Sequence, residues 1–188
     1  MKTTKYDLHE ILRQELKNGS DNLVTRSTGE ILRRRIEKEL ESFEERVKVL
    51  LDFSRVGIID YSCADEIVAK LISRLLSGEY GNKYIVLSGL NENQRENIEV
   101  ALERKELAAI GELRNGRRLL LGILNNYLRE TLDLIHKKGS ITAKELSETL
   151  NLEANTSGTR LLNLHKKRLV VRTDEIREGG RVWVYKKL

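Results

Sequence analysis

Residues 141–172 read ITAKELSETLNLEANTSGTRLLNLHKKRLVVR and set the architecture of the C-terminal part of the chain. Thr142 and Glu145 form a capping-box pattern at the start of a short helix, AKELSETL, and the chain then turns through NLEAN. A longer helix is predicted over about residues 156–168, where Leu161, Leu162 and Leu164 supply the buried side. The pattern predicts two helices joined by a turn.

The segments on either side extend this pattern. Upstream, apolar residues at helical spacing predict a helix that ends at Gly139, with Lys137 and Lys138 in its last turn, where cations complement the helix dipole. Downstream, two β-rich runs, LVVRT and RVWVY, are separated by DEIREGG and predict a hairpin with a charged tip that ends in glycine. The predicted order is three helices followed by a hairpin.

This ordered set, with the following GGRVWVYKK (residues 179–187), resembles the winged helix-turn-helix regulators of bacteria and archaea. The resemblance implies that the last helix enters the DNA major groove, because the groove admits an α-helix and exposes base edges to its first turns. The side chains that could then contact bases are Thr156, Ser157, Arg160 and Asn163. Those that could contact phosphates, or an adjacent minor groove from the hairpin, are Lys166, Lys167 and Arg168 on the helix and Arg177 and Arg181 beside the tip.

Charge is divided unevenly along the chain. From Glu112 onward there are 16 Lys and Arg against 9 Asp and Glu, a net charge of +7, whereas residues 1–111 carry 18 against 20, a net charge of −2. A small basic domain in the cytoplasm more commonly meets nucleic acid than a membrane surface. The charge favours double-stranded DNA as the partner; the alternatives are a solvated face on a protein-interaction module, or RNA.

The N-terminal part alternates strands with helices. Helices are predicted in KYDLHEILRQELKNGS and after the capping-box pair Ser27 and Glu30, with a short strand, DNLVTR, between them. RVKVLLDF and KYIVLSG are nearly continuous apolar runs, as expected of buried strands, and each precedes an amphipathic helix. Asn115-Gly116 suits a tight hairpin or a strand end. We predict an α/β fold with a small α/β domain over residues 1–118, followed by the winged helix-turn-helix domain over residues 119–188.

Residues 50–76, LLDFSRVGIIDYSCADEIVAKLISRLL, resemble the STAS and STAS-like domains, the family that includes the anti-anti-sigma factors. The match consists of a buried strand that ends in Asp52-Phe53, a short loop, and Asp60-Tyr61-Ser62 at the start of a helix. KYIVLSGLNENQRENIEVALE continues the order of strand and helix. The resemblance implies a small α/β sandwich that serves as a docking surface or a homodimer interface, with a histidine-kinase-like ATPase or another protein as partner.

In the anti-anti-sigma factors an Asp-Ser-Ser/Thr-Gly loop carries a phosphorylated serine. The matching string here is Asp60-Tyr61-Ser62-Cys63, so Tyr61 occupies the phosphoserine position, Ser62 follows one place later and Cys63 replaces the glycine. A phosphate on Ser62 would add nearly two negative charges at a helix start and alter any binding surface there. The alternative is structural: Ser62 or Asp60 simply caps the helix.

Few residues suggest metal, redox or catalytic chemistry. His9, His136 and His165 have no metal-ligand spacing, and the acidic residues between 52 and 66 lack a nucleophile motif. We expect no enzyme activity, no cofactor and no metal site. The single cysteine, Cys63, excludes an internal disulfide; it is either a small buried residue or a thiol of lowered pKa.

The first residues, MKTTKYDLHE, lack the apolar core of a signal peptide, and no apolar run approaches the roughly 20 residues that span a bilayer. We therefore expect a cytoplasmic protein without membrane contact. Two functional hypotheses remain. In the first, a DNA-binding transcriptional regulator uses its STAS-like domain to dimerise, bind a partner or sense a signal. In the second, a partner-switching adaptor resembling the anti-anti-sigma factors uses its winged helix to contact protein instead of DNA.

Overall fold

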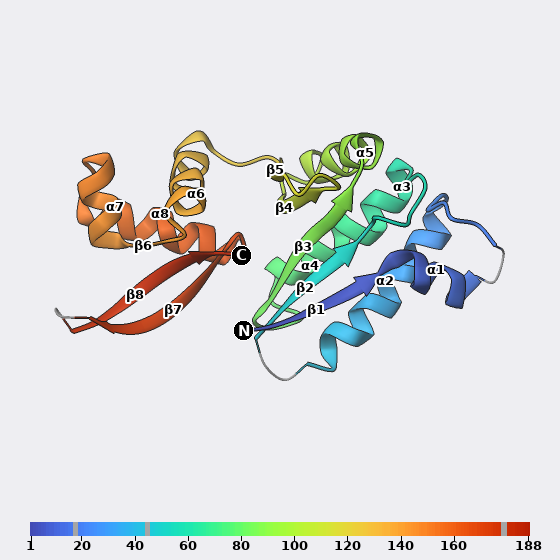
Figure 1. Ribbon diagram of the computed structural model, residues 1–188, viewed down its shortest axis with the longest axis horizontal. Helices are drawn as coiled ribbons and strands as arrows, with labels where there is room; N and C mark the ends of the chain where they lie inside the picture. The colour runs from blue at the N-terminus through green and yellow to red at the C-terminus, as the bar shows by residue number, and fades with distance from the viewer. Residues whose placement is uncertain (17–18, 44–45, 178–179) are drawn as a thin grey trace. The chain divides into compact units, whose positions relative to one another are not determined.

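The computed structural model describes residues 1–16, 19–43, 46–177 and 180–188 (Figure 1). The chain divides into two compact units, Met1–Ile123 (unit 1) and Leu124–Leu188 (unit 2). Each unit combines helices with a sheet, so the chain has a mixed α/β fold. The division lies a few residues after the expected boundary, because Arg118–Gly122 form strand β5, which pairs with β4 in the sheet of unit 1.

Unit 1 is built on a five-stranded sheet in which the strands follow one another in chain order. Its members are β1 (Lys2–Asp7), β2 (Val47–Asp52), β3 (Lys83–Leu90), β4 (Ala108–Leu113) and β5 (Arg118–Gly122). The first four strands are parallel, and β5 runs antiparallel to β4. The turn between β4 and β5 contains the predicted Asn115-Gly116 pair, and Gly116 adopts a φ of +80°, which a glycine tolerates without strain.

The helices of unit 1 connect consecutive strands of the sheet and pack side by side. They are α1 (Leu8–Leu16), α2 (Arg26–Glu41), α3 (Tyr61–Ala64), the π-helical segment η1 (Asp65–Lys70), α4 (Leu71–Leu76) and α5 (Glu92–Glu103). Because α3, η1 and α4 are contiguous in sequence, they form one continuous helix, which contacts α2 on one side and α5 on the other. The core lies between this helical layer and the sheet, with Leu51, Leu87 and Ile36 among its fully or almost fully buried residues.

The start of the chain differs from its prediction. Lys2–Asp7 form strand β1, and the helix begins only at Leu8. Threonine and tyrosine in KTTKYD favour extended backbone, and β2 provides a strand with which the segment pairs in register. The strand expected at DNLVTR is reduced to a single bridge between Leu23 and Ile59.

The start of α2 also differs from its prediction. The helix begins at Arg26, and the cap is Thr25, whose side chain accepts a hydrogen bond from the backbone N–H of Thr28. The predicted pair Ser27 and Glu30 therefore lies inside the helix. A β-branched residue already provided a capping oxygen two positions earlier.

Unit 2 contains three helices and a three-stranded antiparallel sheet of order β6-β8-β7. Its elements are α6 (Asn126–Lys138), β6 (Ser140–Thr142), α7 (Ala143–Leu150), α8 (Ala154–Lys166), β7 (Val170–Arg177) and β8 (Gly180–Lys187). The three helices precede the hairpin in the predicted order. The predicted capping box is confirmed: Thr142 Oγ1 accepts from the Glu145 N–H at 3.2 Å, and Glu145 Oε2 accepts from the Thr142 N–H at 2.6 Å.

Within the described parts of the chain, no helix combines the length and the apolar character needed to cross a membrane.

Candidate functional site

One face of α8 carries a row of polar side chains at helical spacing. We call this the α8 face; it consists of Asn155, Thr156, Thr159, Asn163, Lys166 and Lys167. The opposite side of the helix holds Leu161 and Leu164, which are fully buried, and packs against α6 and α7. The rotation of α8 is therefore fixed by its apolar side, and the α8 face is left accessible.

Arg160 is directed toward α6. Its Nη1 donates to Glu130 Oε2 at 3.0 Å and to the backbone oxygen of Tyr127 at 3.4 Å, and its guanidinium lies 5.4 Å from the centre of the Tyr127 ring. The Arg160 side chain is only 16% exposed. A cavity of about 450 Å³ lies at this place, lined by Tyr127, Asn155, Thr156, Thr159, Arg160 and Asn163. Arg160 thus positions α8 against α6 as well as lining the cavity.

The prediction that Ser157 lies on the outward face is wrong. Its side chain is fully buried, on the same side of the helix as Leu161 and Leu164. Residues four and seven positions apart lie on the same side of a helix, so Ser157 shares the side that packs inward. Its hydroxyl cannot reach a ligand on the α8 face.

The end of α8 supplies the cations of the α8 face. Lys166 is exposed and Lys167, which caps the helix, is half-buried. Neither forms an ion pair with a residue that the structure describes. Arg168 follows in the left-handed conformation, with a φ of +58°. Two lysines whose charges are not paired with a described carboxylate are suited to neutralise an anion.

The hairpin of unit 2 presents an aromatic and an aliphatic side chain to solvent. Trp183 is 50% exposed and Ile176 is 89% exposed. Arg172 lies over the Trp183 ring at 4.2 Å, and Arg181, predicted to contact DNA, pairs with Asp174. Arg177 is the last residue of β7; its side chain, and residues 178–179 of the predicted tip, lie outside the described residues.

The sequence prediction did not single out Asn155, Thr159, Tyr127 or Trp183. Thr159 lies three residues from Thr156 and four from Asn163, and Asn155 lies four residues before Thr159, so helical spacing could have identified both. No local pattern indicates Tyr127 or Trp183, because their exposure depends on how α6 and β8 pack.

Asp60 caps α3 in unit 1. Its Oδ1 accepts from the Cys63 N–H at 2.7 Å and from Ser62 Oγ at 2.8 Å, and its Oδ2 accepts from the Thr25 N–H at 3.0 Å. Burial alone would raise the pKa of Asp60, but these hydrogen bonds outweigh burial and lower it. The structural alternative for Asp60 is confirmed, and phosphorylation of Ser62 stays a prediction.

Cys63 is buried where α3 packs against α2. Its Sγ donates to the backbone oxygen of Thr25 at 2.9 Å. Burial, with the nearby charge of Asp60, raises the pKa of Cys63 to about 12, so the thiolate that redox chemistry needs is not formed at neutral pH. The neighbouring Tyr61 is half-buried, with the guanidinium of Arg104 at 4.5 Å from its ring centre.

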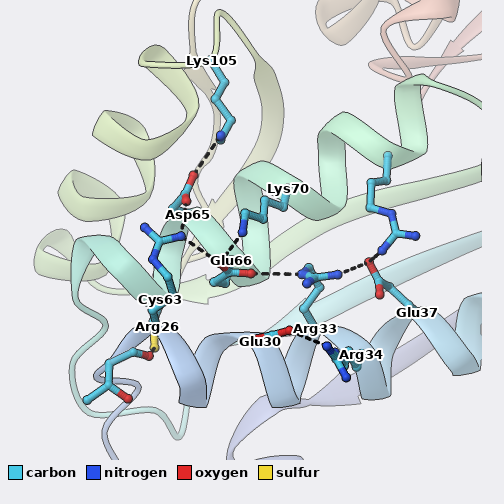
Figure 2. Close-up of polar contacts among 12 residues, drawn as sticks. Arg26, Glu30, Arg33, Arg34, Glu37, Cys63, Asp65, Glu66, Lys70 and Lys105 are labelled. Carbon is cyan, nitrogen blue, oxygen red and sulfur yellow. Dashed lines mark hydrogen bonds and ion pairs between the residues drawn. The ribbon is translucent and has the colours of Figure 1, made fainter.

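A network of buried charges connects α2 with η1 (Figure 2). Glu66, with a side chain 2% exposed, accepts from Arg26 at 2.8 Å, from Arg33 at 3.3 Å and from Lys70. Asp65 pairs with Arg26 at 2.9 Å and with Lys105 at 3.3 Å. Burial opposes ionisation of both acids, but these cations outweigh it, so the pKa values of Asp65 and Glu66 lie below their usual range.

The network continues along α2 to a second buried acid. Glu37 accepts from Arg33 at 2.7 Å, from Arg74 at 2.6 Å and from the Tyr80 hydroxyl at 2.7 Å. Burial and the hydrogen bond to Glu37 raise the pKa of Tyr80, which therefore remains a donor. No single motif in the sequence indicates this network, since its members come from separate elements.

The described residues contain no group of three or more His, Cys, Asp or Glu that could hold a metal ion. No protein-family model matches the chain, and no curated protein matches it. The α8 face offers amide and hydroxyl groups along its first turns and two lysines at its end. This arrangement can form hydrogen bonds and ion pairs with a polar, anionic partner.

Proposed function

We propose that the chain is a DNA-binding transcriptional regulator. Unit 2 would be a winged helix-turn-helix domain that holds double-stranded DNA, and unit 1 a STAS-like domain that dimerises, binds a partner protein or senses a signal. The α8 face carries this proposal, because it combines polar side chains on the first turns of an accessible helix with two lysines at its end that form no ion pair with a described residue. B-DNA's major groove accepts such a helix, and asparagine can bind adenine through two hydrogen bonds.

The charge of unit 2 supports the same function. Residues 124–188 contain 13 Lys and Arg against 8 Asp and Glu, a net charge of +5, whereas residues 1–123 contain 21 of each. The whole excess of the chain therefore belongs to unit 2. In our proposal Asn155, Thr156, Thr159 and Asn163 contact bases and Lys166 and Lys167 contact phosphates, while Arg160 positions the helix.

Reversing the charge at the end of α8 tests this proposal. Full-length protein with Lys166→Glu and Lys167→Glu should bind random duplex DNA about 100-fold more weakly at low salt, as measured by fluorescence anisotropy. The slope of log affinity against log salt should fall by about 1.8, because two phosphate contacts are lost. Arg160 is left intact, since its replacement would also break the contact with α6.

The matched control reverses two charges on a helix of unit 1. Arg34 and Lys38 are exposed on α2, one turn apart, and their replacement by Glu changes the net charge equally. We expect this variant to bind DNA within about threefold of the original protein. Equal affinity of the Lys166 and Lys167 variant and the original protein would exclude the α8 face as the DNA surface.

The exposure of Trp183 and Ile176 favours a second candidate function, the partner-switching adaptor. Exposed aromatic side chains beside arginine are typical of protein interfaces, where tryptophan and arginine are enriched. In this case the full-length protein would shift no duplex DNA even at low salt. Trp183→Ala would then weaken binding to a protein partner and leave the fold unchanged.

A further inference from the structure

Four cations line one cavity of about 280 Å³ in unit 1; they come from α2, from the continuous helix that contains η1 and α4, and from the segment after α5. Its lining residues are Arg33 from α2, Lys70 from the end of η1, Ser73 and Arg74 from α4, and Lys105 after α5. No carboxylate lines the cavity within the described part of the chain. We call it the basic cavity.

Carboxylates behind the basic cavity hold its cations in place. Asp65 pairs with Lys105, and Glu66 pairs with Lys70 and Arg33 (Figure 2). Cations whose positions are fixed before a ligand arrives lose less conformational freedom on binding. The acids therefore preorganise the cavity.

The cations of the basic cavity keep donors that no acid uses. Arg33 donates through Nε and Nη1, and its Nη2 has no acceptor among the residues that the structure describes. Lys70 and Lys105 each pair with one carboxylate, although an ammonium group has three N–H donors. The side chains of both lysines are 38% exposed, so these donors are accessible to a ligand.

The charge of the surrounding network is positive. Its cations are Arg26, Arg33, Lys70, Arg74 and Lys105, and the carboxylates paired with them are Glu37, Asp65, Glu66 and Glu79. Unit 1 as a whole contains equal numbers of basic and acidic residues. The local excess therefore arises from the fold and is not a consequence of composition.

We propose that the basic cavity binds the phosphate group of a small phosphorylated molecule. A phosphate has several acceptor oxygens, which match arginine and lysine donors that approach from different directions. The volume is close to the lower end of the range for small-molecule sites, so it accepts more than a bare ion. The cations converge on one cavity and do not form a line along the surface, which distinguishes the site from a groove for a nucleic-acid backbone.

The test uses full-length protein with inorganic phosphate and pyrophosphate as probes. Isothermal titration calorimetry at constant ionic strength, adjusted with chloride, should show saturable binding. The double variant Lys70→Gln and Lys105→Gln should bind both probes at least about tenfold more weakly. Ser73→Glu, a change at an exposed lining position, should have a similar effect because it places a negative charge in the cavity. The matched control, Arg34→Gln with Lys38→Gln, should bind as the original protein does.

Three outcomes would overturn the proposal. The first is no saturable binding of either probe beyond the chloride reference. The second is unchanged binding in both cavity variants when their melting curves show that they are folded. The third is a loss of duplex-DNA affinity in these variants as large as their loss of phosphate affinity. The last outcome would assign the cations to a nucleic-acid surface. Phosphate binding by unit 1 and DNA binding by unit 2 are measured separately, so the failure of one leaves the other standing.

Discussion

Units 1 and 2 contain charged residues in similar proportion, but they place them differently. In the described residues every buried charged side chain belongs to unit 1: Arg33, Glu37, Asp52, Asp65, Glu66 and Lys83. The buried polar residues of unit 2 are the uncharged Thr131, Thr142 and Ser157. Several buried charges of unit 1 therefore hold helices together, whereas the described charged side chains of unit 2 are all exposed or half-buried, including Arg160, which pairs with Glu130.

This difference predicts which charges can be changed without unfolding the protein. An exposed ion pair contributes little to stability, while removal of one member of a buried pair leaves an uncompensated charge. The surface lysines of α8 should therefore affect binding alone, and the acids beneath the helices of unit 1 should affect folding.

The largest difference in stability between the two units is expected in acid, where unit 1 should be destabilised more than unit 2. Hydrogen bonds and ion pairs outweigh burial and lower the pKa values of four carboxyl groups of unit 1, namely Asp52, Asp60, Asp65 and Glu66. In the unfolded chain these groups have the ordinary values of 3.8 for Asp and 4.5 for Glu, so the unfolded state binds more protons as the pH falls. The stabilisation is complete above these values and is lost as the pH falls through the lowered values of the folded state.

Thermal unfolding followed by circular dichroism between about pH 7 and about pH 2.5 checks this expectation. The fluorescence of Trp183, the single tryptophan, follows unit 2 in the same samples. A melting curve of unit 1 that does not change across this range would contradict the role of the buried acids.

Glu66→Gln should cause the next largest effect. The substitution keeps the shape of the side chain but removes the charge that compensates Arg33, so the free energy of unfolding of unit 1 should fall by about 3–5 kcal/mol. Urea denaturation measures this change. Glu30→Gln is the control, since Glu30 pairs with Arg34 at the surface and its loss should cost at most about 1 kcal/mol. Similar values for both variants would remove the distinction between buried and exposed charges.

Replacing a glycine by alanine should change the free energy of unfolding in opposite directions in the two units. A Cβ at Gly29 would lie 2.8 Å from Glu66 Cβ and 3.0 Å from Cys63 Cα, so Gly29→Ala should destabilise unit 1 by about 1–3 kcal/mol. At Gly158 in α8 an added Cβ meets no atom within 4 Å, so Gly158→Ala should stabilise unit 2 by about 0.4–1 kcal/mol. A stabilising effect of Gly29→Ala in thermal unfolding would show that α2 and η1 are not packed as described, and a destabilising effect of Gly158→Ala would contradict the open space beside α8.

The smallest effect concerns a helix cap of unit 2. Thr142→Ala removes the capping box of α7 and should reduce stability by about 1 kcal/mol, measured by Trp183 fluorescence during urea denaturation. Thr159→Ala provides the control, because Thr159 is exposed on α8 and alanine is the better helix former. A larger loss at Thr159 than at Thr142 would indicate that the α8 face is part of the packing.

Local sequence patterns predicted the elements whose signal lies in consecutive residues. The apolar runs RVKVLLDF and KYIVLSG correspond to β2 and β3, and the pair Thr142 and Glu145 caps α7 as expected. Strand β1 was not predicted, because it lies at the edge of the sheet and its residues are exposed or half-buried, so it has no apolar run. The formation of an edge strand depends more on hydrogen bonds to the neighbouring strand than on its own sequence.

The candidate site shows the same limit at the level of side chains. Helical spacing identified α8 and four of the six residues of the α8 face, but it missed Asn155 and Thr159. It could not show that Ser157 faces inward or that Arg160 pairs with Glu130, because both depend on the rotation of α8 against α6. The charge network of unit 1 could not be predicted either, since Arg33 and Glu66 lie on different helices.

The π-helical segment η1 has a consequence for how the chain can be compared with others. A π-helix bonds each residue to the fifth along, so it holds an extra residue relative to an α-helix. Deleting that residue would restore a regular helix without turning α3 against α4, but the residues inside η1, among them Asp65 and Glu66, would shift relative to their present partners. We expect relatives that keep both Asp65 and Glu66 to keep the extra residue, so an alignment of this helix should contain a gap of one position wherever the paired acids are missing.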